Sequence, residues 1–153
     1  MKILVTGATG FLGKYVIDEL LAHDYSIVAF GRNEKIGKAL EGERVQFVKG
    51  DLSSIEELKQ AFQSVDAVVH AGALSTAWGP WKAFYLANVV GTQNVLDLCR
   101  EYAVKRLVYV SSPSIYAAGK DQLNIKESDA PKENHLNNYI RSKLASEKLF
   151  SDY

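Results

Sequence analysis

The feature that most constrains this chain is a glycine-rich stretch, Thr6 to Gly13, between an apolar run and a helical pattern. Lys2 to Val5 is almost wholly apolar, which is typical of a strand buried on both faces of a parallel sheet. After the glycines, apolar residues recur at helical spacing as far as Leu21. The glycines therefore occupy a strand-to-helix turn, where free backbone N–H groups and the helix dipole favour a bound anion.

Each glycine of this turn has its own expected role. Gly7 permits a tight turn, Gly10 lets a pyrophosphate approach the backbone, and Gly13 lets the helix lie close to the sheet. The pattern therefore predicts a nucleotide-binding site rather than a merely structural turn. The loop residues that we expect to contact the cofactor are Gly7, Thr9, Gly10, Phe11, Leu12 and Gly13.

Further along the chain, strand patterns alternate with helical patterns. This alternation predicts a doubly wound parallel α/β sheet (Rossmann fold) with strand order 3-2-1-4-5 and a ligand crevice beyond the carboxyl ends of the strands. The remaining strands are expected over 26–30, 45–48, 65–70 and 106–110, and the remaining helices over 34–40, from 53 or 54, over 81–102, and from about 135 to the end.

Length and charge limit the partners of this chain. Its 153 residues suffice for one domain with a substantial core. Eighteen basic residues balance eighteen acidic ones, so no overall field favours nucleic acid or an anionic membrane. No stretch is long enough for a signal peptide or a membrane span, and the single cysteine, Cys99, fits a buried helical position. We therefore expect a cytoplasmic protein that binds no nucleic acid, membrane or metal.

The end of the second expected strand bears on the choice of cofactor. An acidic residue there would bind the ribose 2′-hydroxyl of NAD, but the sequence has no carboxylate between Gly31 and Glu34. The guanidinium of Arg32 suits a 2′-phosphate, although a solvated loop arginine also fits the pattern. The sequence therefore slightly favours NADP over NAD.

Tyr139 and Lys143 are four residues apart and share one face of the last expected helix. A lysine ammonium favours the phenolate, which brings a tyrosine within range of proton transfer. Ser111 and Ser112 end the fifth strand at the same crevice, where a hydroxyl can bind a substrate oxygen. His70, at the end of the fourth strand, is interpreted as a structural hydrogen-bonding residue rather than a base.

Six segments together resemble the extended short-chain dehydrogenase/reductase family, the NAD-dependent epimerase/dehydratase superfamily. They follow the order and spacing of the family and comprise residues 6–13, 51–52, 70–73, 88–92, 108–112 and 139–143. Three stretches are most similar to the 3β-hydroxysteroid dehydrogenase branch, namely residues 77–80, 88–92 and 111–114.

This resemblance implies roles for individual residues. Ser112 would hold the substrate oxygen, Tyr139 would exchange its proton, and Lys143 would bind the nicotinamide ribose and tune Tyr139. Asn88 would brace the site from the long helix. Outside the glycine loop, the expected cofactor-binding residues are Arg32, Asp51, Leu52, Ala71, Gly72, Ala73 and Ser111.

The sequence departs from the family pattern in two places. The usual alanine pair after the fourth strand is Gly72-Ala73 here, which is a mild change, and the sequence stops at Tyr153, inside the expected catalytic helix. We therefore expect residues 1–153 to form an incomplete, C-terminally truncated dinucleotide-binding domain that lacks its substrate domain and is inactive alone. We also expect a homo-oligomer, because the outer edge of the fifth strand and some of Ile140, Leu144, Leu149 and Phe150 would be left uncovered.

Three functions are compatible with these motifs. The leading hypothesis is an NAD(P)-dependent oxidoreductase that interconverts a secondary alcohol and a ketone on a steroid-like or other hydrophobic small molecule. A nucleotide-sugar epimerase or dehydratase is the second hypothesis. Dehydratases of this family carry an acidic pair after the catalytic hydroxyl, whereas this chain has Pro113-Ser114 there. Epimerases lack that acidic pair too, so an epimerase remains compatible with the sequence. A dinucleotide-binding module without turnover is the third.

Overall fold

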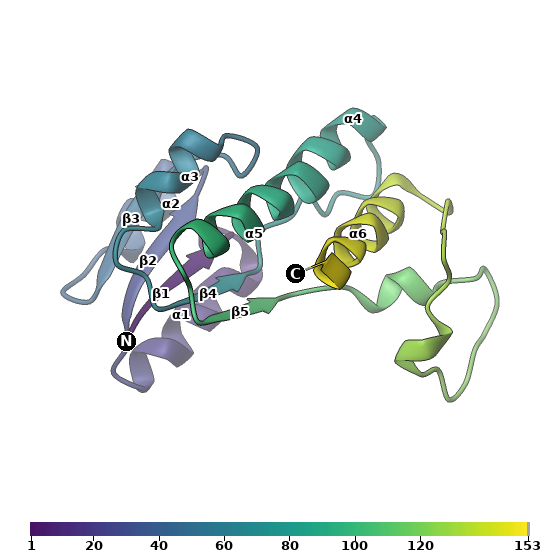
Figure 1. The fold of residues 1–153 in the computed structure, drawn as a ribbon, viewed down its shortest axis with the longest axis horizontal. Coiled ribbons are helices and arrows are strands. Elements are labelled where there is room, and N and C mark those ends of the chain that lie inside the picture. The colour runs from purple at the N-terminus through teal and green to yellow at the C-terminus, as the bar shows by residue number, and fades with distance from the viewer. Residues whose placement is uncertain (153) are drawn as a thin grey trace.

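The structure is a computed structural model that describes residues 1–152, coloured along the chain in Figure 1. Its sheet contains five parallel strands in the order β3-β2-β1-β4-β5, which confirms the predicted Rossmann topology. The strands are β1 (Lys2–Thr6), β2 (Ser26–Gly31), β3 (Val45–Lys49), β4 (Ala67–His70) and β5 (Arg106–Tyr109).

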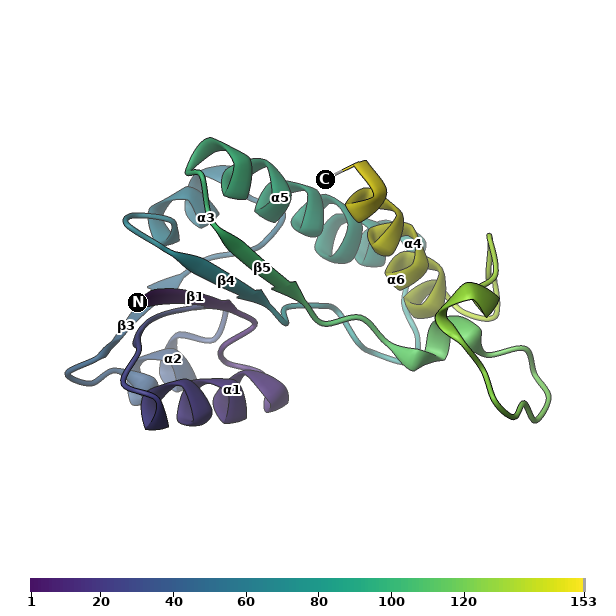
Figure 2. The ribbon, with the colours of Figure 1, turned by 60° about the horizontal axis from the view of Figure 1, so that its bottom comes forward.

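Helices cover both faces of this sheet (Figure 2). On one face lie α1 (Phe11–Ala22) and α2 (Glu34–Leu40), and on the other lie α3 (Ile55–Ala61) and α5 (Gly91–Glu101). The last α-helix, α6 (Asn138–Lys148), lies on the α5 side. The shorter elements are α4 (Trp81–Phe84), the π-helical segment η1 (Tyr85–Val90) and the 3₁₀ helices η2 (Pro113–Tyr116), η3 (Glu127–Asp129) and η4 (Leu149–Asp152). Within residues 1–152, no helix is long and apolar enough to cross a membrane.

Alternation along the strands divides the core into two layers. In β1, Leu4 packs with the buried residues of α3 and α5, among them Leu58. Ile3 and Val5 point the other way and pack with Ile17 of α1. Because both faces of the central strands are covered, these strands are apolar almost throughout, as the sequence pattern predicts.

Two helices differ from the expectation. The long helix appears as one continuous helical run, but η1 interrupts its α-helical geometry. The last helix begins at Asn138 rather than near His135, because the Asn137 side chain caps it by accepting a hydrogen bond from the Ile140 N–H. It then changes to the 3₁₀ helix η4 at Leu149 instead of continuing as an α-helix.

Strand β5 is one of the two edge strands of the sheet, as expected, since β4 is its only neighbour within residues 1–152. Val108 of this strand is 49% exposed. Of the four apolar residues expected to be uncovered in part, Leu149 and Phe150 are partly exposed, whereas Ile140 and Leu144 are buried. The reason is that α6 packs against η1 and η2 and turns both side chains inward.

Self-association therefore stays a prediction that rests on the β5 edge. An edge strand offers unpaired N–H and C=O groups to a second chain. We expect the mass measured by light scattering to rise with protein concentration, and Val108→Lys to suppress that rise by placing a charge on the edge. A strictly monomeric chain at every concentration would contradict the prediction.

Candidate functional site

A cleft of about 640 Å³ opens at the carboxyl ends of the five strands, a size typical of small-molecule and cofactor sites. Every residue that the sequence predicts to contact a cofactor lines this cleft, together with Tyr139 and Lys143. Ser112 and Asn88 do not line it, although Ala87 does. The structure thus brings the glycine loop and the tyrosine–lysine pair, more than 100 residues apart in the sequence, to one cavity.

The glycine loop combines a strained turn with an open helix end. Gly7 has a φ of 70°, and a Cβ atom there would lie 2.6 Å from the Gly72 Cα, so only glycine fits. At Gly13, a Cβ atom would collide with the Gly7 carbonyl oxygen, which explains how closely α1 approaches the loop. Gly10 precedes α1 without a side-chain cap, and no acidic residue occupies the first turn. The N–H groups at this end of α1 therefore suit an anion in the cleft.

A buried polar chain joins the glycine loop to the loop after β4. The Thr6 hydroxyl accepts a hydrogen bond from the Gly72 N–H (3.2 Å) and lies 2.7 Å from His70 Nδ1. His70 Nε2 lies 3.0 Å from the Thr92 hydroxyl of α5. Burial, with a further contribution from the Lys143 charge, lowers the pKa of His70 to about 3. His70 is therefore a neutral, hydrogen-bonded residue, in agreement with its structural interpretation.

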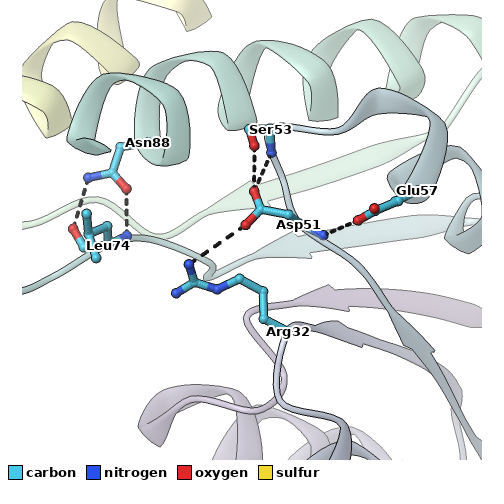
Figure 3. Close-up of polar contacts among 6 residues, drawn as sticks. All are labelled: Arg32, Asp51, Ser53, Glu57, Leu74 and Asn88. Atoms are coloured by element: carbon cyan, nitrogen blue, oxygen red, sulfur yellow. Dashed lines mark hydrogen bonds and ion pairs between the residues drawn. The ribbon is translucent and has the colours of Figure 1, made fainter. Parts of the chain in front are cut away.

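The ends of β2 and β3 are joined by polar side chains (Figure 3). Arg32 Nη1, after β2, is 3.8 Å from Asp51 Oδ2, after β3. Asp51 also accepts hydrogen bonds from the Ser53 N–H (2.9 Å) and hydroxyl (2.7 Å). Burial would raise the pKa of Asp51, but the Ser53 bonds and the Arg32 charge outweigh it and lower that pKa. The tertiary structure thus supplies a carboxylate beside Arg32 that the second strand itself lacks.

Asn88, in η1, does not line the cleft but bonds to a backbone segment that does (Figure 3). Its side chain accepts a hydrogen bond from the Leu74 N–H (2.7 Å) and donates to the Leu74 carbonyl (3.0 Å). It also donates to the Ser142 hydroxyl of α6 (2.8 Å), and its own carbonyl accepts from the Ser146 hydroxyl (3.0 Å). Because Leu74 lines the cleft, Asn88 ties one wall of the cleft to α6.

Lys143 is almost fully buried, at 3% exposure, with its ammonium group at the end of β5. Its Nζ atom donates to the Val110 carbonyl (2.8 Å) and lies 4.2 Å from the centroid of the Tyr109 ring. Burial lowers the pKa of Lys143 to about 8, against the opposing effect of the Glu147 carboxylate. Lys143 is one helical turn beyond Tyr139, and both residues line the cleft.

The two serines at the end of β5 are both engaged within the protein. The Ser111 hydroxyl donates to the Glu147 carboxylate of α6. Ser112 caps η2, because its hydroxyl accepts from the Ser114 N–H (3.3 Å) and lies 2.7 Å from the Ser114 hydroxyl. The structure therefore does not bring the Ser112 hydroxyl to the cleft, where sequence reasoning expected it to hold a substrate oxygen.

Sequence reasoning missed several cleft residues and the partner of Ser111. Three of the missed cleft residues, Gly31, Gly50 and Val110, end or directly follow a strand, which is the signal that could have found them. Glu147 could have been found from its spacing of four residues beyond Lys143. The missed cleft residues are Phe30, Gly31, Asn33, Gly50, Leu74, Ser75, Ala87 and Val110.

Comparisons with known proteins show the family of this chain. The sequence model of the NAD dependent epimerase/dehydratase family matches residues 3–153. The chain is 38% identical over 148 residues to 2-alkyl-3-oxoalkanoate reductase of Shewanella oneidensis, covering 97% of this chain and 38% of that protein. It is 32% identical to the decarboxylating sterol-4-alpha-carboxylate 3-dehydrogenase of Bos taurus, covering 96% of this chain and 40% of that protein.

Solved structures show the same likeness. The NAD complex of UDP-glucose 4-epimerase from Thermus thermophilus has a TM-score of 0.87 and 27% identity, covering all of this chain and 50% of that one. The chain thus spans half or less of each of these relatives. The resemblance to the extended short-chain dehydrogenases/reductases is confirmed, and this chain belongs to the NAD dependent epimerase/dehydratase family.

Proposed function

We propose that this chain is the dinucleotide-binding part of an NAD(P)-dependent oxidoreductase that interconverts a secondary alcohol and a ketone. The observation that carries this proposal is that the glycine loop and the Tyr139–Lys143 pair line one cleft. Two relatives that cover nearly the whole chain are a 2-alkyl-3-oxoalkanoate reductase and a sterol-4-alpha-carboxylate 3-dehydrogenase, which supports a hydrophobic ketone as substrate.

The cleft fits a dinucleotide at three points. The uncapped N-terminus of α1, beginning after Gly10, suits the pyrophosphate. Arg32 and Asp51 suit the adenosine, and Lys143 suits the nicotinamide ribose at the other end of the cleft. A bound nicotinamide supplies the hydride, so the protein has to orient the ketone and move one proton.

The proton is assigned to Tyr139. Its hydroxyl donates to the carbonyl oxygen as the carbonyl carbon is reduced, and takes the proton back when the alcohol is oxidised. The Lys143 cation stabilises the phenolate that remains. Ser112 would reach a substrate oxygen only by leaving Ser114, so its expected role stays a proposal. The chain alone is proposed to bind cofactor without turnover, because it spans half or less of the relatives it matches.

A nucleotide-sugar epimerase is the second candidate, favoured by the TM-score of 0.87 to the Thermus thermophilus enzyme. The Tyr139–Lys143 pair and the glycine loop would serve that chemistry equally well. The higher identities to a reductase and a sterol dehydrogenase favour the oxidoreductase. Net oxidation of added reduced cofactor by a simple ketone distinguishes the two, since an epimerisation consumes no hydride overall.

The first test is calorimetric titration of NAD and NADP into the chain. We expect both to bind, with NADP about tenfold tighter, because the Arg32 guanidinium forms a charge-assisted contact with a 2′-phosphate. The preference is at the lower end of what a charge-assisted contact can give, because Arg32 is largely exposed and Asp51 competes with the phosphate for it. Arg32→Ala should remove the preference while NAD affinity stays the same.

Two further variants complete this titration. Gly10→Val should weaken both cofactors, because its side chain obstructs the pyrophosphate. Arg44→Ala removes a comparable exposed arginine that pairs with Asp24 away from the cleft, and should change neither affinity. Unchanged affinity in Gly10→Val would overturn the placement of the cofactor, and an NADP to NAD ratio unmoved by Arg32→Ala would overturn the role of Arg32.

A further inference from the structure

Helix α6 carries a third ionisable side chain in line with Tyr139 and Lys143. Glu147 is four residues beyond Lys143 and therefore on the same face of the helix. Its carboxylate accepts a hydrogen bond from the Ser111 hydroxyl, while Lys143 Nζ donates to the carbonyl of the preceding residue, Val110. Two successive turns of α6 thus hold two consecutive residues at the end of β5.

Glu127 and Asp129 of η3 act on Tyr116, and Glu147 is the acidic side chain that α6 adds to the group of titratable side chains around this junction. The others are His70 from β4, Tyr109 from β5, Tyr116 from η2 and Tyr139 from α6. Burial raises the pKa of Tyr109, and the Glu147 carboxylate adds to that rise. Burial and then Glu147 likewise raise the pKa of Tyr116. Because the pKa of His70 is lowered and those of Tyr109 and Tyr116 are raised, these three groups are uncharged at neutral pH.

We propose that Glu147 is a positioning residue of this site: its carboxylate, anchored by Ser111, keeps the buried Lys143 ammonium charged and directed at the end of β5. The proposal deepens the proposed function and rests on it for the role of Lys143 beside Tyr139. It also gives Ser111 a defined task, which is to hold the carboxylate rather than to bind cofactor with its hydroxyl.

The physical reason lies in the burial of Lys143. Burial already lowers the pKa of this lysine to about 8, close to neutral pH, and the carboxylate opposes that effect. Without the carboxylate, desolvation would act unopposed and the ammonium would lose its proton at lower pH. A neutral lysine no longer stabilises a phenolate at Tyr139, so the proton transfer assigned to Tyr139 depends indirectly on Glu147.

The test is an NMR titration of the chain labelled with ¹³Cε-lysine, in the absence of cofactor and substrate. The Lys143 signal is assigned by its loss in Lys143→Arg. We expect a titration midpoint near pH 8 in the unmodified chain. Glu147→Gln keeps an acceptor for Ser111 but removes the charge, and should move the midpoint down by roughly one pH unit. Ser111→Ala, which frees the carboxylate to turn toward water, should move it down by less.

The controls separate the charge of Glu147 from general effects. Glu43→Gln removes the same charge from an exposed loop before β3 and should leave the Lys143 midpoint unchanged. Unchanged amide spectra verify that each variant keeps its fold. A midpoint in Glu147→Gln equal to that of the unmodified chain overturns the proposal, and an unmoved midpoint in Ser111→Ala overturns the anchoring role. Because no cofactor is present, these outcomes do not depend on whether the oxidoreductase assignment holds.

Discussion

Replacing Tyr139 by phenylalanine is expected to lower ketone turnover about 10²- to 10⁴-fold while cofactor affinity stays nearly the same. The variant loses only the hydroxyl that carries the proton and keeps the ring that lines the cleft. Lys143 keeps its contact with the Val110 carbonyl, so the nicotinamide end of the cleft retains its cation. The loss should therefore appear in kcat rather than in the dissociation constant of the cofactor.

The measurement is oxidation of reduced cofactor against a panel of hydrophobic ketones, made with the longest open reading frame that encodes this chain. Tyr85→Phe is the matched control, because Tyr85 is an exposed tyrosine that does not line the cleft. A Tyr139→Phe variant that retains most of its kcat would show that another group moves the proton. The 153-residue chain assayed alone should show no steady turnover, and sustained oxidation by it would refute that part of the proposal.

The contribution of His70 to the free energy of unfolding is expected to fall by about 2 kcal/mol between pH 6.5 and pH 4.5. The folded protein holds this imidazole neutral, since burial and the Lys143 charge lower its pKa from 6.5 to about 3. In the unfolded chain the imidazole takes up a proton below pH 6.5, so the unfolded state binds more protons in this window. The free energy of unfolding therefore falls as the pH falls from 6.5 toward 3, and below 3 this contribution changes no further.

Urea unfolding at a series of pH values, compared with the His70→Asn variant, measures this effect. The variant lacks the hydrogen bonds to Thr6 and Thr92 and is expected to be less stable at every pH. The comparison therefore uses the slope of the free energy of unfolding against pH rather than its absolute value. Between about pH 6.5 and 4.5, the free energy of unfolding of His70→Asn should depend less on pH than that of the unmodified chain. His135→Asn, at an exposed position, should leave the slope unchanged. Parallel profiles for His70→Asn and the unmodified chain would mean that His70 is not buried neutral.

The order of the strands, the glycine turn and the shared face of Tyr139 and Lys143 could all be predicted from the sequence. These features depend on local periods, on the handedness of strand–helix–strand connections and on the backbone freedom of glycine, all of which can be read along the chain. The same rules place the ends of parallel strands at one edge. For this reason the expected cofactor residues, from Gly7 to Ser111, do line one cleft.

Which side chains contact one another could not be predicted from the sequence. Arg32 faces Asp51 from another strand, Asn88 clamps Leu74, and Ser111 is bound to Glu147. Ser112, expected at the substrate, instead caps η2. The physical reason is that periodicity assigns a residue to a face or an edge, whereas its hydrogen-bond partner depends on the packing distance and rotamers of elements remote in the sequence. A hydroxyl at a strand end has several acceptors within reach, and only the packed structure selects one.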